Sequence, residues 1–335
     1  MDDVEPPEPV RPAHFTREQL ERVILGDLPG LTSTDVADAA GVTVHEARRL
    51  WRALGFPDAG EAPAFNDADL SALSTLIGTV EAGAIDFDTA VRMTRAVGQT
   101  MARLADWQVA TLAARVEELE AGEEATGSRI GSALRLAEQV GVPFERLLIY
   151  SWRRHLAAAV GRIEALGAAD EDLHTTQVTV GFADLVSFTA LSNEIEESRL
   201  GDMVEIFESR CADVVASRHG RVIKTLGDSV LFVSEDPVQG LEIAFDIVEL
   251  IGNDGRLPDV RLGLATGSVI MRMGDVYGPP VNLAARLTTV ARRNRVIVDR
   301  ETADRLPAED FDTRALTPRP VRGFGVVEPV AARRR

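Results

Sequence analysis

The apolar pattern of this chain changes its period near residue 175, and that change constrains the fold more than any other feature. From Phe15 to about Gly167, apolar residues recur at three- and four-residue spacing, which is typical of amphipathic helices. After that, runs such as QVTVGFADL alternate and are rich in β-branched residues, which is typical of strands. The small, acidic and polar stretch GAADEDLHTTQ between the two patterns predicts a linker.

This change divides the chain into four predicted segments. Residues 1–13 are acidic with four prolines, and they predict a disordered tail. Residues 14–167 predict a helical domain, 168–175 a linker, and 176–335 an α+β domain. In the last segment, the order strand, helix, hairpin, helix, strand, helix, strand predicts a ferredoxin-like sheet with helices over one face.

Composition excludes several classes of protein. The chain has 335 residues, 45% of them hydrophobic, which is enough for two cores. The net charge of -17 argues against broad binding to nucleic-acid phosphates. No apolar run is long enough to span a membrane, and the acidic, Pro-rich start lacks the features of a secretory signal, so we expect a cytoplasmic protein. The single cysteine cannot form an internal disulfide, and the five histidines show no metal-ligand spacing.

One segment of the first half suggests DNA binding. LTSTDVADAAGVTVHEARRLWRALGF has the rhythm of a helix-turn-helix motif, and its second helix carries Arg48, Arg49 and Arg52. The alternative is a plain helical pair inside a bundle. The acidic charge of the chain favours that alternative, so nucleic acid is not expected as a partner.

The stretch VIKTLGDSVLFV predicts a hairpin with an unusual lysine. Lys224 lies in the first strand, four residues before Asp228 at the turn. A lysine in a strand that otherwise looks buried needs a partner. The alternative is an edge strand with Lys224 facing water and Asp228 serving the turn.

A second aspartate is expected near this turn. FADLVSFT places Asp184 at the end of a strand, and if the two strands are neighbours, both carboxylates emerge at one edge of the sheet. Two converging carboxylates suit Mg²⁺, which completes its shell with water and phosphates. The backbone N–H groups of the next four residues open a helix and could cradle a polyphosphate. Those residues are Leu185, Val186, Ser187 and Phe188.

A third motif, GDVYGPPVNLAARL, places Asp275 before a turn and Asn282 and Arg286 on a helix. The last two are four residues apart, so they share one face of the helix. An amide beside a guanidinium suits a ribose and a phosphate. The alternative is a solvated helix face.

Together, FADLVSFT, KTLGD and DVYG-x-x-VN-x-x-x-R resemble the catalytic domain of a class III adenylate/guanylate cyclase, from about Thr176 to Glu328. The resemblance implies conversion of ATP into 3′,5′-cyclic AMP and pyrophosphate, with two Mg²⁺ or Mn²⁺ ions held by Asp184 and Asp228. It also implies that Lys224 and Asp275 read adenine, since the ammonium donates to N1 and the carboxylate accepts from the amino group. Guanylate cyclases are expected to carry Glu and Cys-like residues there.

The resemblance further implies roles for the remaining polar residues. Asn282 would orient the ribose, and Arg286 would stabilise charge on the α-phosphate. The lysine that the family often has near its C-terminus is absent, and Arg322 or Arg319 in PRPVRGFG could replace it. Pro279-Pro280 is a stiff stretch that could alter how the Asn282 helix begins.

The resemblance also implies a homodimer in which the metal residues come from one subunit and the other site residues from its partner. The helical half resembles the regulatory domain of soluble actinobacterial cyclases that respond to pH, and a fatty acid or another small ligand is a candidate effector. His155, beside Arg153 and Arg154, is a candidate pH sensor. A degenerate cyclase domain that only senses nucleotides, and a DNA-binding regulator, are the alternative functions. A diguanylate cyclase would need a Gly-Gly-acidic turn, which the hairpin lacks.

Overall fold

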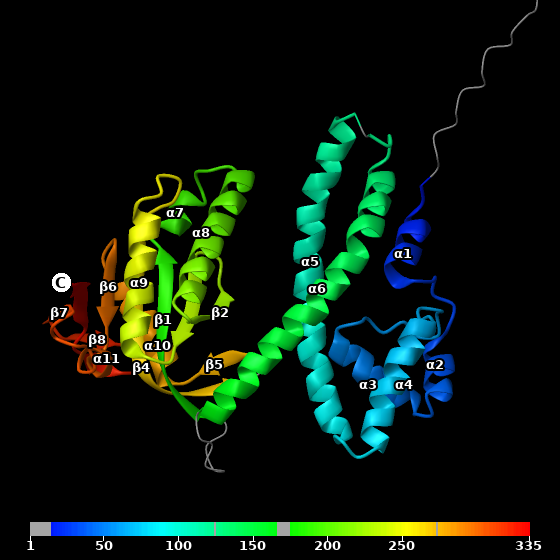
Figure 1. Ribbon diagram of the computed structural model, residues 1–335, viewed down its shortest axis with the longest axis horizontal. Helices are drawn as coiled ribbons and strands as arrows, with labels where there is room; N and C mark the ends of the chain where they lie inside the picture. Colours follow the sequence, from blue (N-terminus) through cyan, green and yellow to red (C-terminus); the bar gives the residue numbers. More distant parts are fainter. Residues whose placement is uncertain (1–14, 124, 166–174, 273) are drawn as a thin grey trace, which may run out of the picture. The chain divides into compact units, whose positions relative to one another are not determined.

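The computed structural model describes residues 15–123, 125–165, 175–272 and 274–335. The chain divides into two compact units, Met1–Gly161 and Arg162–Arg335, which we call the helical unit and the sheet unit (Figure 1). The predicted tail and most of the predicted linker lie outside the described residues. The change of period corresponds to the end of the last helix of the helical unit at Ala165 and the start of the first strand of the sheet unit at Thr175.

The helical unit contains six described helices. They are α1 (Arg17–Leu25), α2 (Ser33–Ala39), α3 (Val44–Leu54), α4 (Asp67–Glu81), α5 (Phe87–Ala121) and α6 (Arg129–Ala165). Helices α1 to α4 begin at capping boxes, in which a Thr or Asn side chain and the residue three positions later bond each other's backbone N–H groups. The core lies among α2, α3, α4 and the start of α5, where Trp51 and Phe65 stack with their ring centroids 4.1 Å apart.

The helix-turn-helix-like segment forms α2 and α3, but its arginines are paired with acidic side chains. Arg49 lies 2.9 Å from Asp88, and Arg52 lies 2.8 Å from Asp58. Arg48 also reaches Asp58, at 3.9 Å. Guanidinium groups neutralised within the chain are poor phosphate ligands, so this segment fits the plain helical pair.

The sheet unit is built on one large mixed sheet. Its strands are β1 (Thr175–Leu185), β2 (Arg221–Thr225), β3 (Ser229–Ser234), β4 (Val260–Arg272), β5 (Asp275–Tyr277), β6 (Arg295–Val298), β7 (Phe311–Ala315) and β10 (Val330–Arg334), and a separate hairpin comprises β8 (Arg319–Val321) and β9 (Gly325–Val327). The helices are α7 (Phe188–Leu191), α8 (Glu197–Ser217), α9 (Pro237–Gly252), α10 (Pro279–Val290) and α11 (Arg300–Ala303). The strand order is β2-β3-β1-β4-β6-β10-β7, with β5 paired to β4, and only the β4–β6 pair is parallel.

Both faces of the central strands are apolar, and both are covered by helices. In β1, Ala183 and Leu185 pack with α8 and α9, whereas Val178 and Val180 pack on the other face with Ala284 of α10. Figure 1 shows α8 and α9 side by side across β1. The expectation of helices over a single face is therefore wrong, because alternate residues of β1 supply apolar side chains to both faces.

Helix α10 lies unusually close to β4. A Cβ atom at Gly263 would come within 2.2 Å of the Thr288 nitrogen and 2.5 Å of the Ala284 oxygen. This glycine therefore permits the approach that fixes α10 over the sheet. Throughout the residues that the structure describes, no helix combines the length and apolarity needed to cross a bilayer.

Candidate active site

Three polar side chains form a row across the central strands, on the face that α10 covers. The strand register places Asp184 directly opposite Ser229 on β3 and opposite Arg261 on β4. Residues directly opposite in antiparallel strands share a face and interact. The Ser229 hydroxyl donates to Asp184 Oδ1 at 2.5 Å, and Arg261 places Nε and Nη2 each 2.7 Å from Asp184 Oδ2. We call these three residues the site row.

Asp228 lies at the tip of the β2–β3 hairpin, next to this row. Burial raises the pKa of Asp228, and the negative charge of Asp184 raises it further, whereas Arg261 acts in the opposite direction. Two carboxylates therefore share one guanidinium, and the cluster retains negative charge. This excess of negative charge favours binding of a cation beside Asp184 and Asp228.

The ligand set fits a metal that also binds its substrate. Among the described residues, no group of three or more His, Cys, Asp or Glu side chains could hold a metal by itself. Two carboxylates with the rest of the shell from water and phosphate oxygens is the arrangement that Mg²⁺ prefers. Asp184 and Asp228 therefore fit a divalent cation that arrives with a polyphosphate.

The predicted backbone cradle is only half available. The Leu185 N–H donates to the Asp228 carbonyl at 3.0 Å, and the Val186 N–H donates to the Asp259 carbonyl at 2.8 Å. The prediction is therefore wrong for these two residues, because β1 continues through Leu185 and occupies their N–H groups. Ser187, in the left-handed conformation with φ 61°, and Phe188 stand at the N-terminus of the short helix α7.

Lys224 has the partner that its position in the strand requires. Strand β2 is the edge of the sheet, but Lys224 Nζ lies 2.5 Å from Asp275 Oδ2 at the start of β5. The two side chains are only 34% and 23% exposed, so the alternative of a lysine facing water is wrong. Burial acts to raise the pKa of Asp275, but hydrogen bonds from Lys224 and the Val276 N–H outweigh it, and the pKa lies below its usual value.

Asn282 and Arg286 line an open pocket at the start of α10. The turn between β8 and β9 contributes Arg322 and Phe324 to the same pocket. Among the described residues, neither Arg286 nor Arg322 has a carboxylate partner, so both are available to an anion. The full lining is Gly278, Pro279, Asn282, Arg286, Arg322, Gly323 and Phe324.

Arg319 begins β8 and does not line the pocket, which favours Arg322. Pro279 and Pro280 form the first turn of α10 and therefore start the helix rather than distort it. The lining of this pocket includes neither the metal carboxylates nor the Lys224–Asp275 pair. Within the described chain, the site residues therefore form three groups: the site row with Asp228, the Lys224–Asp275 pair, and the α10 pocket.

The sequence reasoning did not identify Ser229, Arg261 or Phe324. The signal for Arg261 was a charged residue within the otherwise apolar segment VRLGLA. Its partner Asp184 is 77 residues away, and only the β1–β4 register brings them together.

Comparison with known proteins identifies the family of this chain. A family model of the adenylate and guanylate cyclase catalytic domain matches residues 171–330. An adenylate cyclase of Streptomyces coelicolor is 40% identical over 95% of this chain and 89% of its own length. A pH-sensitive adenylate cyclase of Mycobacterium tuberculosis is 30% identical over 88% of this chain and 75% of its own length.

A solved structure is also similar to the sheet unit. The catalytic core of a rhodopsin-guanylyl cyclase with converted specificity, in complex with ATPαS, is 22% identical with a TM-score of 0.46, covering 48% of this chain and 98% of that one. The match to the Streptomyces relative extends over nearly the whole chain, including the helical unit. The chain therefore belongs to the family of class III adenylate and guanylate cyclases.

Proposed function

We propose that this protein is an adenylate cyclase that converts ATP into 3′,5′-cyclic AMP and pyrophosphate. The observation that carries the proposal is the pairing of Lys224 with Asp275 on the same sheet as the site row. The Lys224–Asp275 pair would recognise adenine. The site row with Asp228 would supply the acidic cluster that phosphoryl transfer with a divalent cation requires.

The acidic cluster would handle the polyphosphate. Asp184 and Asp228 are the residues that would hold two Mg²⁺ or Mn²⁺ ions, which when bound supply charge neutralisation and a lowered pKa for the ribose 3′-OH. Ser229 holds one oxygen of Asp184 and so fixes its direction. Arg261 can exchange Asp184 for phosphate oxygens, since a guanidinium binds both groups in the same forked geometry.

The Lys224–Asp275 pair would select the base. The ammonium can only donate, which matches N1 of adenine, and the carboxylate can only accept, which matches the exocyclic amino group. Guanine presents an N1–H and a carbonyl oxygen, so both contacts would fail. Unsatisfied polar groups in a half-buried site discriminate strongly against the wrong base.

The α10 pocket would hold the reacting centre. Asn282 would orient the ribose so that its 3′-oxygen attacks the α-phosphorus. The new O3′–P bond replaces the bond to the bridging oxygen of pyrophosphate, and the hydroxyl proton leaves to water. Arg286 would stabilise the charge that develops on the α-phosphate, and Arg322 would bind the departing phosphates.

A second copy of the chain completes the site in this proposal. Asn282, Arg286 and Arg322 line one pocket, and neither metal carboxylate is part of its lining. A head-to-tail homodimer would bring the carboxylates of one subunit to the pocket of the other and form two equivalent sites.

The helical unit would regulate this site. Nine residues separate the end of α6 from β1, the strand that carries Asp184, so a shift of the helix can be transmitted to the metal carboxylate. His155 is exposed on α6 next to Arg154 and remains a candidate pH sensor. One relative is named for its pH sensitivity, whereas neither the relatives nor the structure supports a fatty-acid ligand.

The test is an assay of the purified protein with ATP and GTP, each with Mg²⁺ and with Mn²⁺, across pH. We expect cyclic AMP from ATP and far less product from GTP. Replacing the base-reading pair (Lys224→Glu with Asp275→Cys) should greatly reduce ATP use. Nucleotide binding without turnover under every condition would instead support the degenerate sensor.

A further inference from the structure

Protein donors surround the carboxylate of Asp184 on both of its oxygens. The Ser229 hydroxyl donates to Oδ1 at 2.5 Å, and two guanidinium nitrogens of Arg261, Nε and Nη2, each lie 2.7 Å from Oδ2. A carboxylate offers about four lone-pair positions, and three donors face this one. The Asp184 side chain is also only 15% exposed. A cation that binds Asp184 in this arrangement therefore has to displace a donor.

The two donors differ in whether they can stay when a cation binds. A serine hydroxyl can turn its hydrogen away and offer a lone pair, so Ser229 is compatible with a cation beside Asp184. The guanidinium of Arg261 has no acceptor and keeps its positive charge, so it cannot share an oxygen with a divalent cation. Arg261 is thus a competitor of the cation for Oδ2 of Asp184.

Arg261 has no second anion in the described protein to which it can move. Among the described residues, Asp184 is the only acidic side chain that forms an ion pair with Arg261. On the other side of β4, the residue directly opposite Arg261 is Arg295 of β6, which is also a cation. A partly buried charge that loses its partner is costly. Polyphosphate oxygens can replace Asp184, because they fit the same fork of N–H groups.

We propose that Arg261 couples the binding of cation and polyphosphate: it blocks Asp184 against a divalent cation until phosphate oxygens take over its guanidinium. This inference deepens the proposed function, on which it rests for the identity of the polyphosphate. Because coupling between two ligands is reciprocal, the cation and the polyphosphate each raise the affinity for the other. The site therefore binds a free cation weakly and a cation with its nucleotide tightly.

Binding of Mn²⁺ to the full chain without nucleotide tests the competition directly. Arg261→Met keeps the apolar stem of the side chain and removes the guanidinium. It should raise the affinity for Mn²⁺ at least about tenfold, because a charge-assisted competitor is gone from Oδ2. Adding Asp184→Asn to this variant should abolish the gain, which places the tighter site at Asp184. Electron paramagnetic resonance measures free Mn²⁺, and circular dichroism shows that the variants are folded.

Arg295→Met is the matched control for the loss of one positive charge. Arg295 continues the row across the sheet, two strand spacings or about 10 Å from Asp184. At that distance a charge near the surface is largely screened, so its removal should change the affinity for Mn²⁺ less than about threefold. An equal gain in both variants would show a general effect of charge and would overturn the competition.

The reverse experiment measures the other side of the coupling. With EDTA present, Asp184→Asn should raise the affinity for inorganic tripolyphosphate at least about tenfold, because it releases Arg261 from its ion pair. Asp228→Asn removes the same charge from the neighbouring carboxylate, which forms no ion pair with Arg261 among the described residues, and should give a clearly smaller gain. Isothermal titration calorimetry measures both affinities. Equal gains would contradict the release of Arg261.

The outcomes separate this inference from the proposed function. If the protein forms cyclic AMP but Arg261→Met binds Mn²⁺ no more tightly than the natural chain, the coupling is overturned and the cyclase assignment stands. If Arg261→Met binds Mn²⁺ more tightly but the natural chain forms no cyclic AMP, the competition stands and the cyclase assignment fails.

Discussion

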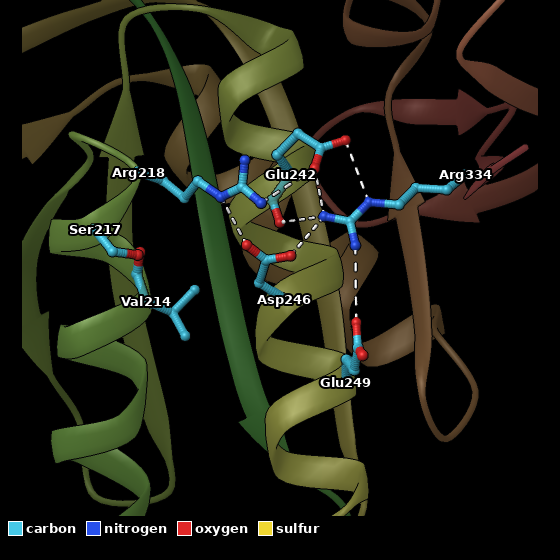
Figure 2. A network of polar contacts seen from close by, with 7 residues as sticks. All are labelled: Val214, Ser217, Arg218, Glu242, Asp246, Glu249 and Arg334. Carbon is cyan, nitrogen blue, oxygen red and sulfur yellow. Dashed lines mark hydrogen bonds and ion pairs between the residues drawn. The ribbon is translucent and has the colours of Figure 1, made fainter.

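Two clusters of carboxylates and arginines lie in the sheet unit, and they differ in how completely the protein neutralises them. The first, which we call the α9 network, joins Arg334 of β10 and Arg218 at the end of α8 to three acidic residues of α9 (Figure 2). Asp246 lies 2.5 Å from Arg334 and 2.7 Å from Arg218, and Glu242 contacts both arginines. Glu249 makes only a distant, exposed contact with Arg334, at 3.9 Å.

The second cluster is the site row with Asp228. Within the part of the chain that the structure describes, Arg261 is the only cation that pairs with either carboxylate of this cluster, and its close contacts are with Asp184. Burial and Asp184 raise the pKa of Asp228, whereas in the α9 network Glu242 and Asp246 are each shared by two arginines. In this protein, the number of half-buried carboxylates does not distinguish the candidate cation site from the α9 network. The shortage of arginine or lysine partners around those carboxylates does.

The largest expected effect tests which cluster serves the reaction. Asp184→Ala or Asp228→Ala should reduce turnover by at least about a thousandfold, because each removes half of the protein ligands to the metal. Asp246→Ala, in the α9 network, should leave the turnover of folded protein within a few-fold of normal. Cyclic AMP formation measures this, with circular dichroism as the folding control. Near-normal turnover of either site variant at saturating Mn²⁺ would contradict the assignment.

If the site is shared between subunits, the site row is only half of it. Asp184→Ala and Arg286→Ala chains should each be inactive alone. When they are mixed, roughly a quarter of normal activity should return, because about half of the dimers are mixed and each then holds one intact site. Activity that stays absent, with mixed dimers demonstrated by differently tagged chains, would place the two groups within one chain.

The α9 network should instead contribute to stability. Arg334→Ala removes contacts to Glu242 and Asp246 and leaves these half-buried carboxylates with one arginine, so we expect a loss of about 1–2 kcal/mol in the free energy of unfolding. For a unit of this size, that corresponds to a few degrees in Tm. Turnover at low temperature should stay near normal. If Arg334→Ala instead lost activity without losing stability, the α9 network would serve the reaction and not the fold.

The contrast between the clusters also explains what the sequence could predict. Turn chemistry is local, so the hairpin, Lys224 within it and Asp228 at its tip were all predictable. Asp184 was placed correctly because the strand that precedes it is strongly β-branched. Arg261 and Arg334 were not predictable, because their partners lie 77 and 88 residues away and are set by strand register and helix packing.

The two wrong expectations have the same origin. The N–H groups of Leu185 and Val186 are occupied because neighbouring segments pair with them, which a pattern within one strand does not reveal. The placement of α10 on the second face of the sheet depends on Gly263, whose missing side chain admits the helix. In the helical unit, the amphipathic period predicted the helices but could not show which of their large apolar side chains would remain exposed.

The smallest effect gives the most direct physical test of the comparison, because it needs no substrate. The pKa of Asp228 in the folded protein lies above its unfolded value, so the folded state binds the proton more tightly. Ionisation of Asp228 therefore costs folding stability as pH rises from the unfolded pKa through the folded pKa, and this cost persists at neutral pH. Asp228→Asn should remove it and stabilise the sheet unit by less than about 1 kcal/mol at pH 7 with divalent cations chelated. Glu242→Gln in the α9 network should have the opposite sign, since it leaves Arg218 and Arg334 short of a carboxylate. Urea unfolding between pH 4 and 8 measures the change in the free energy of unfolding for each variant. A change of the same sign in both variants would contradict the proposed difference between the two clusters.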